Sequence, residues 1–87
     1  MNPGDRYVLS HRKVLLTDLT DPGPGLGKVC EGEQHMHPGG TPVRILEMSQ
    51  RSSRVLIETV NEPKQYAWVN EDDLMPEMEW RLQEASD

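Results

Sequence analysis

Three side chains between Cys30 and His37 offer ligands for a metal ion. The spacing is Cys30-x4-His35-x-His37, and zinc in proteins binds thiolate sulfur and imidazole nitrogen. Structural zinc loops usually carry their ligands as closely spaced Cys-Cys or His-His pairs, so a fourth ligand has to come from Glu31, Glu33 or a distant histidine. These residues define a candidate zinc site, with a flexible loop that carries two histidines as the alternative.

Two catalytic interpretations of the same region lack essential parts. Cys30 with a nearby histidine resembles a nucleophile and its base, but no third group is placed to orient that base. The run from Gly23 to Lys28 has the glycine content of a phosphate-binding loop, yet Pro22 and Val29 stand where that loop needs glycine and Ser or Thr. We therefore predict a protein that is not an enzyme and needs no cofactor. Zinc is the one metal ion that the sequence offers as a candidate ligand.

Four basic residues suggest contact with nucleic acid if the turns that carry them lie side by side. They are Arg12, Lys13, Arg51 and Arg54. Lysine and arginine bind phosphates, but no aromatic residue that would stack on a base is interleaved with these four. Nucleic acid is therefore an unfavoured partner.

Acidic residues concentrate at the C-terminal end of the chain. Seven of the 15 acids lie between Glu71 and Asp87, where Arg81 is the one base, so this segment carries the whole formal charge of -6. An acidic surface repels phosphates and attracts basic groups. It favours a protein partner with a basic surface, or serves solubility alone.

The elements that position these residues begin with three short strands. We predict them over Thr41–Met48, Arg54–Val60 and Gln65–Asn70, because each run is rich in β-branched or aromatic residues and is bounded by polar turn residues. Gly4–Ser10 and Val14–Leu19 are predicted to form an opening hairpin.

The connection from 20 to 40 is predicted as a long loop. It holds six of the seven glycines and three of the seven prolines, a composition typical of loops. A loop of this length in a compact domain is usually functional, disordered or a misassigned element, and it has room for a hairpin of its own with residues 28–30 as one arm.

Side chains alternate across a strand, which divides the last of the three predicted strands into two faces. Val69 is predicted to lie in the core, and Tyr66 and Trp68 on the outer face that a partner can reach. Asp72 and Asp73 follow directly and are predicted to extend this partner-binding surface.

Residues 40–47, 55–58 and 67–74 together resemble the second half of a Src-homology-3-like domain of the bacterial type. In that family a Gly-x-x-apolar-x-apolar strand leads into a hairpin, and a Trp-Val pair, a one-turn 3₁₀ helix and a closing strand end the barrel. The resemblance implies an all-β fold, a small barrel of about five strands over residues 1–75 including loop 20–40, and it carries little functional specificity. Leu16 and Leu19 replace the family's aromatic residues, so binding of proline-rich peptides is not implied.

Residues 76–87 are predicted to form a short acidic helix, with a loosely packed acidic tail as the alternative. Pro76 suits its first turn, and Glu77 is placed to pair with Arg81 at i,i+4. Met78 shares one stripe with Met75 and Leu82, whereas Trp80 points to another side, so only one of these faces packs on the sheet. Met78 and Trp80 are therefore both candidate partner contacts.

Length and composition complete the prediction. The chain has 87 residues, enough for one domain, and its single cysteine gives no internal disulfide. Residues 1–6 lack an apolar signal region and no run approaches the ~20 apolar residues of a membrane span, so we expect a cytoplasmic protein that does not enter a membrane. The predicted function is a non-enzymatic protein-interaction module, similar to small accessory or inhibitor proteins of bacteria or phages; a zinc-stabilised loop module and a nucleic-acid-contacting barrel are the alternatives.

Overall fold

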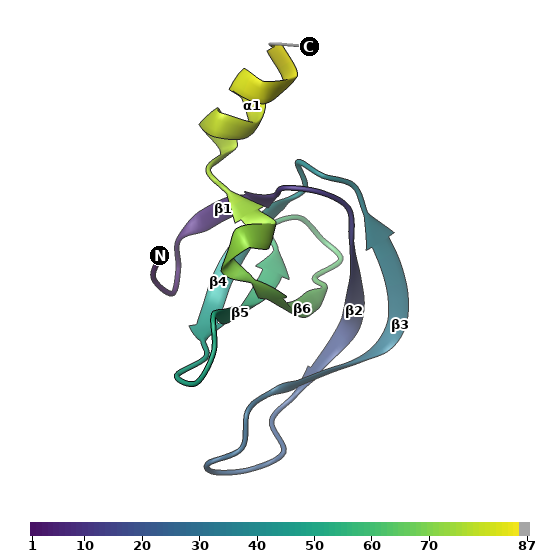
Figure 1. The fold of residues 1–87 in the computed structure, drawn as a ribbon. Helices are drawn as coiled ribbons and strands as arrows, with labels where there is room; N and C mark the ends of the chain where they lie inside the picture. Colours follow the sequence, from purple (N-terminus) through teal and green to yellow (C-terminus); the bar gives the residue numbers. More distant parts are fainter. Residues whose placement is uncertain (86–87) are drawn as a thin grey trace.

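Within residues 1–85, the part of the chain that the computed structural model describes, seven strands form one antiparallel sheet and a short helix follows (Figure 1). The predicted all-β fold with a C-terminal helix is therefore confirmed, while residues 86–87 of the predicted 76–87 segment lie outside the described part. The elements are β1 (Arg6–Leu9), β2 (Lys13–Thr20), β3 (Val29–His37), β4 (Pro42–Met48), β5 (Arg54–Thr59), β6 (Tyr66–Asn70), the 3₁₀ helix η1 (Glu71–Asp73), β7 (Leu74–Met75) and α1 (Glu77–Ala85).

The sheet is open. Its strand order is β3-β2-β6-β5-β4-β1-β7, and over the described residues the two edge strands β3 and β7 do not pair with each other. The prediction of a closed barrel of about five strands is thus wrong in both strand number and closure. The additional strands are β3, inside the predicted loop, and the two-residue β7.

The predicted loop 20–40 is largely a long hairpin. β2 and β3 pair over most of their length, from Lys13 opposite His37 to Thr20 opposite Val29. We call these two strands and the turn between them the β2–β3 ribbon. Its register shifts beside Gly32, whose φ of 98° is the left-handed conformation that glycine adopts freely in a bulge. Residues 21–28 form a tip without strand structure, and residues 38–40 connect β3 toward β4 as a turn.

The predicted opening hairpin of the first two strands does not form. β1 instead pairs with β4 and β7, while β2 pairs with β3 and, at Leu16 opposite Tyr66, with β6. The turn after β1 is held by Ser10, whose backbone N–H donates to the Asp73 carbonyl at 2.8 Å. β1 and β2 therefore belong to opposite halves of the sheet.

The core lies on the concave side of the sheet, where the predicted alternation holds. Val69 is 5% exposed, as predicted, and Val55 and Ile57 of β5 are fully buried with it. Leu56 points to the other face of β5 and is nevertheless completely buried. The core cluster comprises Leu9, Leu15, Val43, Ile45, Val55, Ile57, Ala67, Val69 and Leu74.

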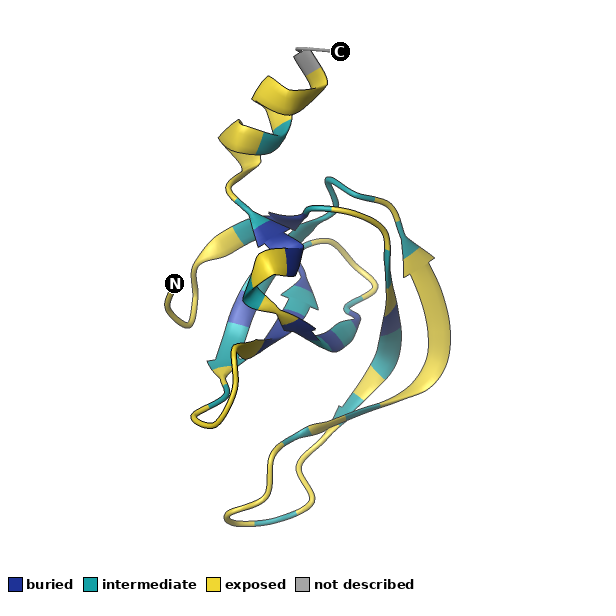
Figure 2. Ribbon diagram, in the orientation of Figure 1, coloured by how far each residue is buried: buried dark blue, intermediate teal, exposed yellow. Residues whose placement is uncertain are grey.

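Helix α1 stands at one end of the sheet and is largely exposed (Figure 2). It is attached through Trp80, since a Cβ on Gly39 would lie 2.8 Å from Trp80 Cη2 and one on Gly40 would lie 2.7 Å from its Nε1. These two glycines thus make the flat seat for the indole ring. The predicted pair of Arg81 with Glu77 forms at 3.0 Å.

Candidate functional site

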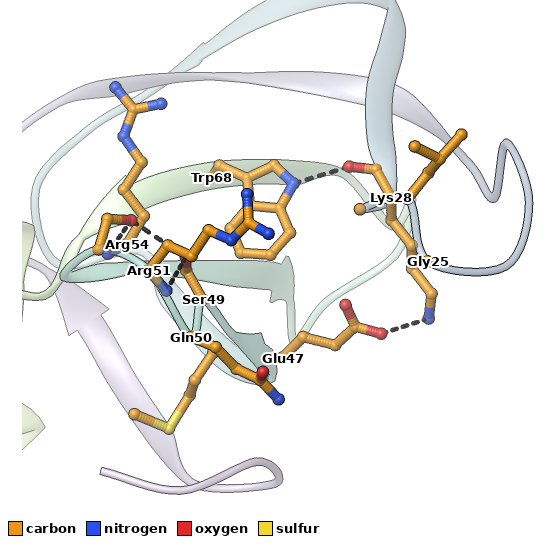
Figure 3. A pocket seen from close by; sticks show the side chains of 12 residues that line it. Gly25, Lys28, Glu47, Ser49, Gln50, Arg51, Arg54 and Trp68 are labelled. Carbon is orange, nitrogen blue, oxygen red and sulfur yellow. Dashed lines mark hydrogen bonds and ion pairs between the residues drawn. The ribbon is translucent and has the colours of Figure 1, made fainter.

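A groove lies between two hairpin tips at the end of the sheet away from α1. One wall is the tip of the β2–β3 ribbon (residues 25–28), the other is the β4–β5 hairpin (residues 47–54), and Trp68 of β6 lies between them (Figure 3). The groove is open to solvent and has a volume of about 620 Å³. We call this space the Trp68 groove.

Trp68 is held rigidly in the groove. Its indole Nε1–H donates a hydrogen bond of 2.9 Å to the carbonyl of Lys28, which ties β6 to the ribbon tip (Figure 3). In the β5–β6 register Trp68 lies opposite Leu56, the completely buried residue on this face of the sheet. Trp68 itself is partly exposed. The ring therefore presents a fixed aromatic surface to anything that enters the groove.

Charge in the groove is unbalanced. Lys28 Nζ lies 3.1 Å from Glu47 Oε1, so these two groups neutralise each other across the groove. Arg51 and Arg54 have no carboxylate partner among the residues that the structure describes. The groove therefore has an excess of positive charge, although the whole chain is acidic.

The arginine-bearing turn is ordered by serine side chains. Ser49 Oγ accepts the Arg51 backbone N–H at 3.2 Å, Ser52 Oγ accepts that of Arg54 at 3.3 Å, and the two hydroxyls bond each other at 3.1 Å. Serine hydroxyls stabilise tight turns in this way. The two guanidinium groups are thus presented by a folded turn.

Apolar side chains complete the groove. Leu26, at the ribbon tip, is 64% exposed and lines the groove with Trp68. Met48 also borders the groove, but it lies opposite Val55 and therefore on the other face of the sheet from Trp68. Leu26 and the Trp68 ring thus provide an apolar surface next to two cations. Such a surface suits a ligand that combines a large apolar side chain with acidic groups.

The predicted residue Tyr66 shares the outer face with Trp68 but lies outside the groove. It is half-buried, opposite Glu58 of β5 and Leu16 of β2. Burial raises the pKa of the Tyr66 phenol, and the negative charges of Glu58, Glu62 and Asp18 raise it further. Tyr66 is therefore surrounded by acids rather than by the cations of the groove.

Asp73, predicted as a partner contact, is used inside the fold. It is 8% exposed, and its carboxylate lies 3.1 Å from both Lys13 Nζ and His11 Nε2. It also accepts the backbone N–H of Asn70 at 3.1 Å. Of the two predicted acids, only Asp72 is exposed.

The structure resolves the choice that the sequence left open on α1. Trp80 packs on the glycine pair 39–40, so it is not the exposed contact that its sequence position also allowed. Met78 and Leu82 are 75% and 66% exposed. An apolar stripe flanked by carboxylates thus faces outward from α1.

The candidate zinc ligands do not come together. Cys30 and His35 are five residues apart on β3, and a strand rises about 3.3 Å per residue, which separates their backbones by about 16 Å. His37 bonds the Gln65 side chain, and His35 Nε2 lies 3.4 Å from Glu33. Among the described residues no three His, Cys, Asp or Glu side chains are close enough to share a metal ion.

The four basic residues considered for nucleic acid do not form one surface. Lys13 is paired with Asp73. Arg12 lies in the turn between β1 and β2, and the end of β1 pairs with the start of β4 at Pro42. Arg51 and Arg54 instead belong to the hairpin that follows the other end of β4 (Figure 1). Only these last two arginines share a site.

Sequence reasoning identified Trp68 but not its surroundings. Leu26 gave no signal, because its approach to Trp68 depends on how two distant hairpins fold. The arginines were noted only as a basic tip. The one usable signal was the alternation of side chains along β6, which places Trp68 on the outer face of the sheet. The glycine-rich segment contacts Trp68 on that face through Lys28.

Comparison with protein-family models, curated proteins and solved structures gave no match to this chain. No helix in the described part of the chain is long and apolar enough to cross a membrane. The resemblance to Src-homology-3-like domains stays a prediction that rests on residues 40–74.

Proposed function

We propose that the protein is a non-enzymatic interaction module that binds an acidic segment of a protein partner in the Trp68 groove. The observation that carries this proposal is Trp68 itself, a partly exposed ring that donates a 2.9 Å hydrogen bond to Lys28 between two hairpin tips. Rigid aromatic anchors of this kind dominate the binding free energy of many protein interfaces.

The charges define the partner. Because Glu47 is already paired with Lys28, an incoming carboxylate meets Arg51 and Arg54 without an opposing acid. Arginine binds carboxylates through paired N–H groups, and complementary charge raises the association rate. The partner segment therefore carries acidic residues beside one large apolar side chain that packs on Trp68.

A displayed library of random peptides tests this function. Peptides selected on the wild-type protein should be acidic and contain an aromatic or large aliphatic residue. They should lose about tenfold or more in affinity on Trp68→Ala and on Arg51→Glu, since removing an anchor weakens binding by about 2 kcal/mol.

Arg12→Glu is the matched control, because it makes the same charge change outside the groove. Selected peptides that bind Trp68→Ala and Arg51→Glu as tightly as the wild type would contradict the proposal. Equal loss on Arg12→Glu would mean that net charge, and not the groove, governs binding.

A second candidate function concerns α1. The specific observation is that Trp80 faces the sheet, which leaves Met78 and Leu82 exposed next to Glu79. Amphipathic helices bind apolar grooves through such stripes. We propose that the exposed face of α1, with Asp72, binds a partner with a basic surface. The double substitution Met78→Ser and Leu82→Ser should abolish that contact and leave peptide binding in the Trp68 groove unchanged.

A further inference from the structure

Strand β3 presents a long free edge. Over the described residues it pairs only with β2, and seven of its nine residues are exposed (Figure 2). In an antiparallel edge strand every second residue directs its N–H and C=O groups away from the neighbouring strand. This edge therefore offers unpaired backbone donors and acceptors to another strand.

Natural proteins protect such edges with bulges and charges. Here the bulge at Gly32 and the carboxylates of Glu31 and Glu33 occupy only the first half of β3. The second half carries the imidazole of His35, whereas His37 bonds the Gln65 side chain of its own chain. The edge thus presents a carboxylate at Glu33 and an imidazole at His35, so two copies in opposite directions complement each other.

We propose that the β3 edge pairs with β3 of a second copy of this chain, antiparallel about a two-fold axis at Gln34. This register places Glu33 opposite His35, and the two-fold axis repeats the pair. The bulge at Gly32 ends the regular ladder beyond Glu33, so residues 33–35 of each copy carry the pairing. Opposite-charge and donor–acceptor pairs of this kind stabilise adjacent strands.

The neighbouring registers are less favourable. An axis at Glu33 sets the two Glu33 carboxylates directly against each other, and like charges in opposed positions destabilise strand pairing. In the Gln34 register each His35 lies between its own Glu33, at 3.4 Å in the single chain, and Glu33 of the other copy. Carboxylates and imidazoles then alternate along the joined edge.

Pairing at this edge is independent of the Trp68 groove. The ladder uses residues 33–35, whereas the ribbon contributes residues 25–28 to the groove. A dimer can form whether or not a peptide binds at Trp68. Because the ladder is short and partly interrupted by the bulge, we expect a weak, concentration-dependent dimer.

Disulfide trapping tests the register. In a Cys30→Ser background, Gln34→Cys places two thiols on the axis, where facing residues of antiparallel strands have Cα atoms about 5 Å apart, within disulfide range. Met36→Cys is the matched control: in this register its two copies lie about 13 Å apart, too far to bond. Gln34→Cys should form the dimer under mild oxidation and Met36→Cys should not. Equal cross-linking of both variants, or none at position 34, overturns the proposal.

Charge exchange tests the side-chain pairs by analytical ultracentrifugation. His35→Glu sets carboxylates against Glu33 and should weaken the dimer about tenfold or more, whereas adding Glu33→Lys to it should restore dimerisation. All three proteins should melt at similar temperatures, because both positions are exposed. A wild-type chain that remains monomeric up to roughly 1 mM overturns the proposal, as does a dimer that His35→Glu leaves unchanged.

Discussion

Trp68 should contribute to folding as well as to binding, and two substitutions separate its contributions. Trp68→Phe keeps most of the ring but removes the N–H that donates to Lys28. The net value of such a bond is about 1 kcal/mol, and the exposed ribbon tip lets water replace part of it. We therefore expect Trp68→Phe to lower the free energy of unfolding by about 0.5 to 1 kcal/mol.

Trp68→Ala also removes the ring that lies beside Leu56. A buried tryptophan covers about 150 to 250 Å², and Trp68 is mostly but not completely buried, so about 150 Å² is at stake. At about 25 cal/mol per Å², that area corresponds to about 4 kcal/mol. With the lost hydrogen bond, Trp68→Ala should lower the free energy of unfolding by about 4 to 5 kcal/mol.

Urea denaturation followed by circular dichroism measures both variants without relying on tryptophan emission. Val69→Ala, in the adjacent core position, is the reference and should cost about 2 kcal/mol. Equal losses for Trp68→Phe and Trp68→Ala would mean that the hydrogen bond, and not ring burial, carries the effect. Wild-type stability in Trp68→Ala would refute the claim that the indole covers this face of the sheet.

Three further predictions concern other parts of the fold. Gly32→Ala should lower the free energy of unfolding by about 1 to 3 kcal/mol in thermal melts, because a φ of 98° is strained for alanine and its Cβ would collide with the side chains of Thr17 and Asp18 on β2. Gly27→Ala is the control and should change the stability little, because a Cβ there meets no other atom. Asp73→Asn should cost about 1 to 3 kcal/mol in urea, since it removes the carboxylate charge that pairs with Lys13 and lies 3.1 Å from His11 Nε2. Exposed Asp72→Asn should stay within about 0.5 kcal/mol. Burial raises the pKa of the Cys30 thiol, and a hydrogen bond from the Trp68 backbone offsets this shift only in part. Cys30 should therefore react with iodoacetamide more slowly in the folded protein than in urea. Equal rates would contradict the burial of this thiol.

Strands β4, β5 and β6 were predictable to within one residue, because their own residues favour strands and polar turn residues bound them. β-Branched residues and period-two alternation determine which side chains face the core, and Val69 followed directly from that pattern. Strand β3 was not predictable in the same way. Both its faces are exposed, so its residues show no alternation, and it exists because β2 supplies a pairing partner.

The candidate site was predictable only where it depends on one strand. The alternation of β6 gave Trp68, but the positions of Arg51 and Leu26 around it depend on the folding of two hairpins that are distant in sequence. The role of Asp73 was missed for a related reason. Its partners His11 and Lys13 precede it by about sixty residues, and nothing in their local sequence marks the contact.

The attachment of the β2–β3 ribbon makes it a lever. Among the described residues, the ribbon pairs with the rest of the sheet at Leu16, opposite Tyr66. Its tip is attached by the hydrogen bond from Trp68 to Lys28, which lies about five strand residues, or about 16 Å, from Leu16. A rotation of about 10° at the sheet joint would move the tip by about 3 Å, enough to change the width of the groove while the core keeps its packing. Ribbon amides should therefore exchange with deuterium through a local opening of lower free energy than that of β5, and a ligand that bridges Trp68 and the tip should slow this exchange selectively.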